Sequence, residues 1–264
     1  MRSLLPDRAV IGLSGPELRG FLQGLITNNV EKLAPDVPLY AALLTPQGKI
    51  LFDFILADDG VGGILLDCVA GAREALVKRL SMYRLRAKVE IAPRADLAVV
   101  AGWGETKPQG AFPDPRLSAL GWRMIGPKEK LQGGADYLSH RLSLGVPEGA
   151  DFGSDRIFAL EGDLEDLNGV AFNKGCYVGQ ELTARMKHRG TARKRLLSLT
   201  AEAALPQPGT AVMAGQTGIG EITSVHGTRG FALIRLDRLD ETKGHALAAN
   251  GISVKVAKPA WLSA

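Results

Sequence analysis

The sequence predicts an α+β fold with largely antiparallel sheet, followed by a small closed β-domain at the C-terminal end. In the first 190 residues, apolar runs of strand length alternate with segments of helical periodicity. Neighbouring strands follow one another through short turns, which favours hairpins over the long crossovers of a parallel sheet. After about residue 191, short β-type runs are punctuated by Pro and Gly, a pattern typical of a small closed β-domain.

The first hundred residues supply most of the expected sheet. A strand at 9–13 precedes Ser14-Gly15-Pro16-Glu17, which has the spacing of a helix-capping box with proline in the first turn. A second helix is expected at 71–83, where apolar residues recur every three or four positions. Five further strands are expected, the first two joined by a hairpin turn at 46–49: 39–45, 50–57, 64–69, 88–92 and 97–101.

The remainder of the chain contains more loop before the β-domain begins. Residues 104–120 hold three prolines and are expected to form a loop, as is 145–155. A short strand at 121–125 and a helix near 135–144 lie between them. Five strands are expected in the C-terminal β-domain: 195–200, 210–213, 218–225, 231–236 and 252–256.

The composition is that of an ordinary globular protein and excludes several classes. With 264 residues, 45% of them hydrophobic, the chain can bury a core without metals or disulfides. Cys68 and Cys176 are far apart and form no CxxC pair, which argues against a disulfide framework and against a self-contained zinc or iron–sulfur site. No run approaches 18 apolar residues, and the N-terminus lacks the apolar segment of a signal peptide. We therefore expect a cytoplasmic protein that does not enter the membrane.

The most informative feature is an octapeptide that places one thiol between two glycines: Lys174-Gly175-Cys176-Tyr177-Val178-Gly179-Gln180-Glu181. Apolar residues after it indicate a helix that begins near Gly179 or Gln180, so the thiol would precede a helix N-terminus. The positive helix end and the Lys174 ammonium would both favour the thiolate, which can attack an electrophile or ligate a metal. Most free cysteines are instead small buried hydrophobic residues, and Cys68, in an apolar strand, fits that description.

Three other features have both a functional and a structural interpretation. Strand alternation puts Asp53 on the face opposite Ile50; it could accept hydrogen bonds from a heteroaromatic ligand, or it could form a salt bridge. The acidic run 161–166 could bind a cation, although such runs are more often a helix N-terminus or an exposed turn. The basic run 185–195 could bind an anionic ligand tail, an acidic partner or RNA, or it could be a solvated face.

These residues make the chain resemble a known family. Residues 167–185, which contain the octapeptide, are similar to the YgfZ-type folate-binding proteins of the glycine-cleavage T-protein (aminomethyltransferase) superfamily. The branch that the chain resembles most contains the mitochondrial assembly factor that acts late, on [4Fe–4S] proteins. Three supporting segments extend the resemblance along most of the chain: 21–28, 83–89 and 141–147.

The resemblance implies two α+β lobes and a C-terminal β-barrel around a central channel, in which tetrahydrofolate or a derivative binds. We accordingly divide the chain into 1–103, which includes part of the second lobe's sheet, 104–190, which carries the octapeptide, and 191–264, the barrel. Cys176 would be the functional thiol and a shared ligand of a transient iron–sulfur cluster. Lys174 would assist it, and Gly175, Tyr177, Gly179, Gln180 and Glu181 would support the motif.

The resemblance also implies where folate is held. Asp53 is the nearest match to an aspartate that helps hold the pterin in aminomethyltransferases, whereas Ser143 stands where those enzymes carry a pterin-contacting glutamate. Tyr137 is expected to form an aromatic wall, and the basic run 185–195 to accept the negative glutamate tail. The expected folate contacts are Asp53, Tyr83, Arg86, Tyr137, Arg141 and Arg185.

The favoured function is a folate-binding accessory factor for assembly or repair of iron–sulfur clusters, chiefly in [4Fe–4S] proteins, without classical turnover. Its partners would be iron–sulfur assembly proteins and client proteins, in the bacterial cytosol or, in a eukaryote, the mitochondrial matrix. A tetrahydrofolate-dependent aminomethyl or methyl transferase is the alternative; it needs acid–base groups beside the pterin, for which Asp53 is the candidate. An RNA- or protein-binding module ranks last, because aromatic residues are not interleaved with the basic run.

Overall fold

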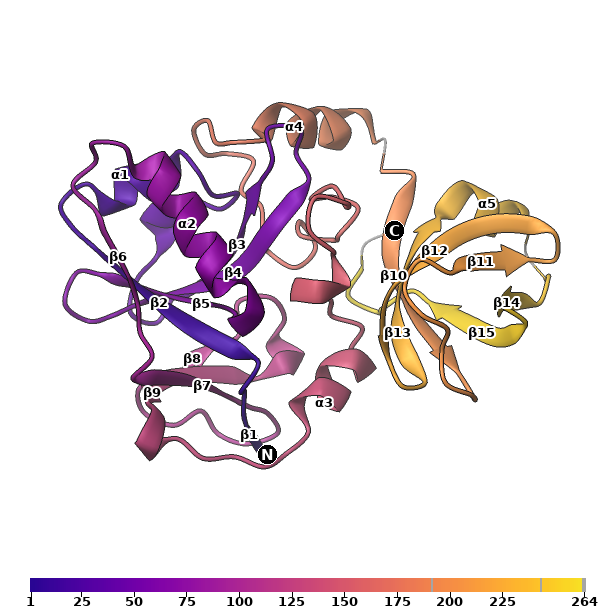
Figure 1. Ribbon diagram of the computed structural model, residues 1–264, viewed down its shortest axis with the longest axis horizontal. Coiled ribbons are helices and arrows are strands. Elements are labelled where there is room, and N and C mark those ends of the chain that lie inside the picture. The colour runs from indigo at the N-terminus through magenta and orange to yellow at the C-terminus, as the bar shows by residue number, and fades with distance from the viewer. Residues whose placement is uncertain (191, 243, 263–264) are drawn as a thin grey trace.

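The computed structural model describes residues 1–190, 192–242 and 244–262 (Figure 1). They form two lobes, each built on an antiparallel sheet, and a closed C-terminal barrel, so the predicted fold class is confirmed. In Figure 1 the two sheets lie on one side of the molecule and the barrel on the other. The expected start of the barrel, Thr191, lies outside the described residues, and the first barrel strand begins at Lys194. In the described part of the chain, no helix combines the length and apolarity needed to cross a bilayer.

The N-terminal lobe contains a five-stranded antiparallel sheet in the order β3-β4-β5-β2-β6. Leucines of α1 and α2 pack on one face of this sheet, and residues of the second lobe pack on the other. Burial on both faces explains why its strands are continuous apolar runs instead of alternating ones. Its elements are β2 (Arg8–Ser14), α1 (Leu18–Gln23), η1 (Val30–Lys32), β3 (Leu39–Leu44), β4 (Ile50–Asp58), β5 (Ile64–Val69), η2 (Ala70–Ala72), α2 (Arg73–Arg84) and β6 (Glu90–Pro93).

The second lobe contains a four-stranded antiparallel sheet in the order β1-β7-β9-β8. Its first strand comes from the N-terminus of the chain. Asp136 begins α3 by accepting a hydrogen bond from the Ser139 N–H (3.0 Å). The elements are β1 (Arg2–Leu4), β7 (Leu97–Gly102), β8 (Phe112–Pro113), η3 (Ser118–Leu120), β9 (Trp122–Pro127), η4 (Lys128–Lys130), α3 (Tyr137–Ser143), η5 (Gly149–Asp151) and α4 (Gln180–Arg189).

The C-terminal unit is a closed antiparallel barrel in the order β10-β13-β12-β11-β14-β15. All five predicted strands are present, and the sequence missed two elements, α5 and β14. β14 has only three residues, too few to display a period of two. The elements are β10 (Lys194–Ala201), β11 (Ala211–Ala214), β12 (Thr217–His226), β13 (Arg229–Arg235), α5 (Leu236–Glu241), β14 (Leu247–Ala249) and β15 (Ile252–Ala257).

The predicted capping box before α1 is wrong. Ser14 is the last residue of β2, and Glu17 is the N-cap of α1 without a side-chain capping bond. The Glu17 carboxylate instead accepts a hydrogen bond from the Lys88 N–H (2.5 Å). The local pattern assigns the Glu17 carboxylate to capping α1. In the structure this group instead makes a tertiary contact with the segment before β6.

The alternation expected in β4 is interrupted by a β-bulge. The register between β3 and β4 shifts by one residue, which leaves Leu51 without a partner. Ile50 therefore packs in the same core as Ile55, on the side of the sheet that carries Asp53, and not opposite it. Residues beyond the bulge keep the expected alternation.

The turn after α2 is strained. The Ala87 N–H donates to the Arg84 carbonyl oxygen (2.8 Å), and Leu85 between them has φ 47° and ψ −106°. These angles are those of the first central residue of a type II′ turn, a position that normally requires glycine. A leucine there costs about 1–3 kcal/mol, and its side chain is 86% exposed.

Candidate functional site

The three units meet at a group of buried charged side chains, which we call the central ion cluster. Each member is at most 8% exposed: Arg8, Asp53, Asp67, Asp114, Arg116, Arg123, Arg141, Glu148 and Asp151. Asp67 of β5 accepts hydrogen bonds from Arg8 of β2 (2.6 Å) and from Arg123 of β9 (2.7 Å). Arg123 (2.9 Å) and Arg116 (2.8 Å) both donate to Asp114. These contacts join the sheets of the two lobes.

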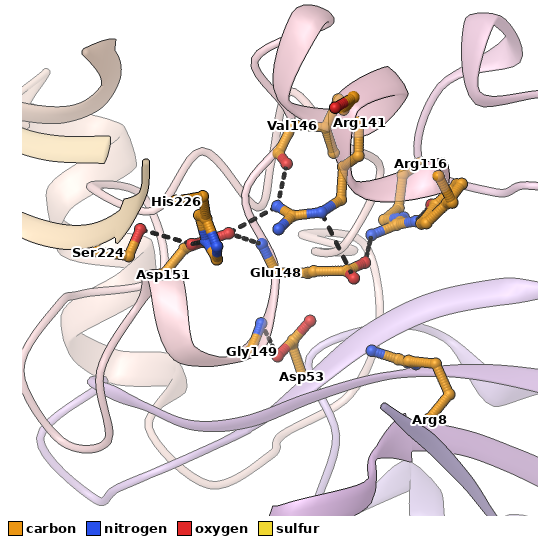
Figure 2. Close-up of polar contacts among 12 residues, drawn as sticks. Arg8, Asp53, Arg116, Arg141, Val146, Glu148, Gly149, Asp151, Ser224 and His226 are labelled. Atoms are coloured by element: carbon orange, nitrogen blue, oxygen red, sulfur yellow. Dashed lines mark hydrogen bonds and ion pairs between the residues drawn. The ribbon is translucent and has the colours of Figure 1, made fainter. Parts of the chain in front are cut away.

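The cluster continues into the barrel (Figure 2). Arg141 of α3 lies 3.5 Å from Glu148 and donates to Asp151 (2.6 Å). The other oxygen of Asp151 accepts a hydrogen bond from the Ser224 hydroxyl (2.5 Å) and lies 3.3 Å from His226 Nε2. Both residues belong to β12, so the chain of charged contacts extends from the N-terminal sheet to the barrel.

The charges of neighbouring arginines outweigh the effect of burial on the carboxylate pKa values in this cluster. Burial alone would raise the pKa of Glu148, but the charges of Arg141 and Arg116 outweigh it and hold that pKa well below its ordinary value. Arg116 donates directly to the Glu148 carboxylate (2.5 Å). The pKa of Asp114 is lowered in the same way, against burial, by Arg116 and Arg123. These carboxylates are therefore ionised in the folded protein at neutral pH.

Asp53 lies at the edge of the cluster and is the exception. It accepts hydrogen bonds from the Tyr40 hydroxyl (3.1 Å) and the Gly149 N–H (2.9 Å). Burial raises its pKa. Figure 2 shows the Arg8 guanidinium extending from β2 toward Asp53, and Arg8 Nη1 is buried without a hydrogen-bond partner in the described residues.

A cavity of about 370 Å³ opens beside Asp53, between β4, β5, the start of α2 and residues 149–154. Its walls are largely apolar, with Phe52, Val69 and Cys68 among them. Burial raises the pKa of the Cys68 thiol to about 12, which agrees with its predicted role as a small core residue. This cavity lies beside the central ion cluster, and the expected central channel stays a prediction.

The octapeptide forms a loop anchored at three points, and the thiol lies between them. Lys174, Tyr177 and Gly179 are buried, whereas Gly175 and Cys176 are exposed. Gly179 has φ 83° and packs against the β3–β4 hairpin, where a Cβ would lie 2.6 Å from a carbonyl oxygen. Helix α4 begins at Gln180, as predicted. The loop therefore presents one accessible sulfur atom from a fixed backbone.

The Lys174 ammonium anchors the loop to the end of α1. Its ammonium donates to the carbonyl oxygens of Gln23 (2.9 Å), Ile26 (2.7 Å) and Asn28 (2.8 Å), which follow or end α1. It also lies 5.0 Å from the ring centre of Tyr177. All three N–H groups are thus engaged in fixing the loop, and burial lowers the Lys174 pKa to about 8.

The remaining octapeptide residues and the predicted folate contacts lie in separate places. Asp53, Tyr137 and Arg141 come together at the central ion cluster, where the Tyr137 hydroxyl accepts hydrogen bonds from two arginines (2.8 Å each). Tyr83 packs on the helix side of the N-terminal sheet, and Arg86 is exposed just after α2. Glu181 and Arg185 form an exposed ion pair on α4 (2.7 Å), and Gln180 is half-buried at its start. Ser143 is exposed and donates to the His140 carbonyl oxygen.

Two residues of the basic run form ion pairs with the acidic run. Arg195 donates to Asp163 (2.9 Å) and Asp166 (3.0 Å), and Lys187 forms an ion pair with Glu165. The described residues contain no group of three or more His, Cys, Asp or Glu side chains suited to hold a metal ion. A cavity of about 310 Å³ lies between the two runs, with Glu165, Lys187 and Arg195 in its walls, so the binding of a folate tail by the basic run stays a prediction.

Sequence reasoning missed most of the central ion cluster. Arg8, Asp67, Arg116, Arg123 and Glu148 are spread over 141 positions of the chain, and no local motif connects them. A signal was present in part, because Arg8 and Asp67 stand in apolar strands where an unpaired charge would be costly.

The architecture defines the class of protein. The glycine cleavage system aminomethyltransferase T from Bartonella henselae superimposes with a TM-score of 0.76, over 99% of this chain and 86% of that one, at 17% sequence identity. The chain thus has the fold of that aminomethyltransferase. Residues 193–264 match the family described as the CAF17 C-terminal beta-barrel domain.

Sequence comparison identifies the particular family. The chain is 36% identical to the human mitochondrial iron–sulfur cluster assembly factor IBA57, over 97% of this chain and 84% of the human protein. It is 35% identical to the mouse protein of the same name, over 89% and 77%. The chain therefore belongs to the IBA57 family of iron–sulfur cluster assembly factors, and the family resemblance is confirmed. These relatives are mitochondrial, so the expected cytoplasmic location stays a prediction.

Gly179→Ala should destabilise the protein by about 2 kcal/mol or more, because a Cβ would meet the Thr45 carbonyl oxygen at a positive φ. Urea unfolding of the purified protein measures the change. Gly175→Ala is the matched control: no atom lies within 4 Å of its Cβ, so the free energy of unfolding should stay within about 0.5 kcal/mol. Equal losses in both variants would contradict the close contact with the hairpin.

Glu148→Gln should destabilise the protein by about 3 kcal/mol at pH 7, because it leaves buried arginines without their carboxylate. Since the folded-state pKa of Glu148 is lowered, its contribution to stability is present above the unfolded pKa and is lost as pH falls below about 4. The difference between variant and wild type should therefore shrink toward pH 3 in urea unfolding curves. Glu181→Gln, in an exposed ion pair, should change stability by about 0.5 kcal/mol or less; a constant difference for Glu148→Gln at all pH values would contradict the lowered pKa.

Proposed function

We propose that this chain is a folate-binding accessory factor that assists assembly of [4Fe–4S] clusters and that Cys176 is its contact thiol. The observation that carries the proposal is an exposed thiol on a loop that is anchored on both sides of the thiol. The anchors are three ammonium hydrogen bonds before the thiol, and a buried tyrosine and a packed glycine after it. A fixed, accessible sulfur suits transient ligation better than a mobile one, because less entropy is lost on binding. The family membership supplies the chemical context.

One thiol is not enough to hold a cluster. Iron–sulfur clusters are usually bound by four cysteine thiolates, and the described residues contain no group of three or more His, Cys, Asp or Glu side chains that could hold a metal ion. Cys176 would therefore ligate one iron of a cluster whose other ligands belong to a partner of the assembly machinery. Such a shared cluster could be transferred, because it would dissociate from Cys176 together with the partner.

The cavity beside Asp53 suits a pterin. The pyrimidine edge of a pterin offers N–H donors next to a carbonyl acceptor. Asp53 retains acceptor capacity on both oxygens, and Arg8 Nη1 is a buried donor without a partner. The volume of about 370 Å³ and the apolar walls are typical of small-ligand sites. Asp53 would bind the edge, and Phe52 and Val69 would exclude water from the ring.

Cys176→Ala should abolish function without affecting the fold. In a strain that lacks its own factor of this family, the wild-type chain should restore the activity of a [4Fe–4S] enzyme such as aconitase, and the variant should leave it near the level of the empty strain. Because the side chain is exposed, the Tm of the variant should stay within about 2 °C of wild type. Gly175→Ala should rescue fully; full rescue by Cys176→Ala would remove the thiol from the mechanism.

Asp53→Asn should weaken tetrahydrofolate binding about tenfold or more, because the amide replaces an acceptor by a donor that faces the pterin N–H groups. Isothermal titration of the purified protein under anaerobic conditions measures the Kd. Tyr83→Phe tests the other expected contact and should leave the Kd unchanged, since Tyr83 packs on the helix side of the sheet. Loss of binding in Tyr83→Phe but not in Asp53→Asn would place the ligand elsewhere.

A further inference from the structure

The outer end of α2 carries exposed apolar and basic side chains that the proposed function does not use. Lys78, Met82 and Leu85 follow one another at helical spacing and are all exposed, Met82 by 62% and Leu85 by 86%. Figure 1 shows this end of α2, just before β6, on the side of the N-terminal lobe away from the barrel. We call Lys78, Met82 and residues 84–88 the α2-end surface.

Leu85 is unfavourable here for two independent reasons. Its backbone occupies the glycine position of a type II′ turn, with φ 47°. Its side chain is among the most exposed large apolar groups of the described residues. A glycine would relieve the strain and remove the exposed apolar area, so the folded chain alone gives no reason for a leucine. A contact made outside the chain would give one, because the strained turn holds the side chain outward in a single direction.

The surroundings of Leu85 are strongly basic. Arg84, Arg86 and Lys88 flank it in sequence, Lys78 lies two turns earlier, and all four are exposed. In the described part of the chain no ion pair engages Lys78, Arg86 or Lys88. The Glu17 carboxylate accepts a hydrogen bond from the Lys88 N–H (2.5 Å) and offsets one of these charges. The surface therefore presents an excess of positive charge around an apolar centre.

We propose that the α2-end surface docks an acidic segment of a partner protein, with Leu85 as the apolar anchor. Charge complementarity selects a negatively charged partner, and a central apolar anchor within a polar rim is the usual arrangement of binding hot spots. A protein partner fits better than an anionic lipid surface, because lipid tails accept an apolar side chain in many orientations and would not need a strained turn to fix one.

The binding test uses a fluorescent helical peptide in which leucines at positions i, i+3 and i+4 alternate with glutamates. Wild-type protein should bind it, and the same peptide with lysine in place of glutamate should not bind. Leu85→Gly should weaken binding about tenfold or more, the effect expected for loss of one buried leucine. The same variant should raise the Tm by roughly 2–4 °C, because the strain is relieved. Arg86→Glu should also weaken binding, most at low salt.

Val61→Ser is the matched control. Val61 is 89% exposed in the turn between β4 and β5, beside Asp58 and Asp59 and not beside basic residues, so peptide binding should not change. Absence of binding to wild type, or equal binding by Leu85→Gly, would overturn the proposal. Binding of phosphatidylglycerol vesicles that Leu85→Gly abolishes, without peptide binding, would assign the surface to lipid and overturn it as well. The binding assay does not depend on the proposed function, which fails separately if wild type does not rescue the [4Fe–4S] enzyme.

Discussion

The arrangement of the three units depends on the central ion cluster. Its members come from β2, β4, β5, β9, α3 and the segments around them, and its last contacts reach β12 of the barrel. Buried charges are costly unless each one is paired and hydrogen-bonded. In the observed placement of the units, Asp67 is satisfied from both sheets and Asp151 from both the second lobe and the barrel. A different placement that separated these partners would leave charges buried and unpaired.

The pairing within the cluster changes toward the cavity beside Asp53. Pairing is complete in the middle of the cluster and incomplete at its edge, where Arg8 Nη1 lacks a hydrogen-bond partner among the described residues and burial raises the Asp53 pKa. The strand that carries Asp53, β4, begins at the hairpin that packs on Gly179. The β3–β4 hairpin thus connects the cavity with the thiol loop through one rigid element, although the two sites share no side chains.

The sequence predicts the fold well and the site only in part. Apolar periodicity identifies most helices and strands, because each of these elements buries a face against a core that any compact packing would provide. Patterns fail where a tertiary contact decides the outcome: Glu17 binds the Lys88 N–H instead of capping α1, and a β-bulge at Leu51 turns Ile50 to the other face. The central ion cluster joins residues that are far apart in sequence, and nothing local in one chain reveals which arginine meets which carboxylate.

The octapeptide shows how a motif can be specific for structural reasons. Lysine is needed because its three N–H groups match three converging carbonyl oxygens, and glycine is needed where a Cβ would strike the hairpin. The cysteine side chain, in contrast, faces solvent and has no structural role in the anchored loop. The Lys174 ammonium thus fixes the loop from which the sulfur is presented, and this structural role is what the hydrogen bonds of the motif require of a lysine.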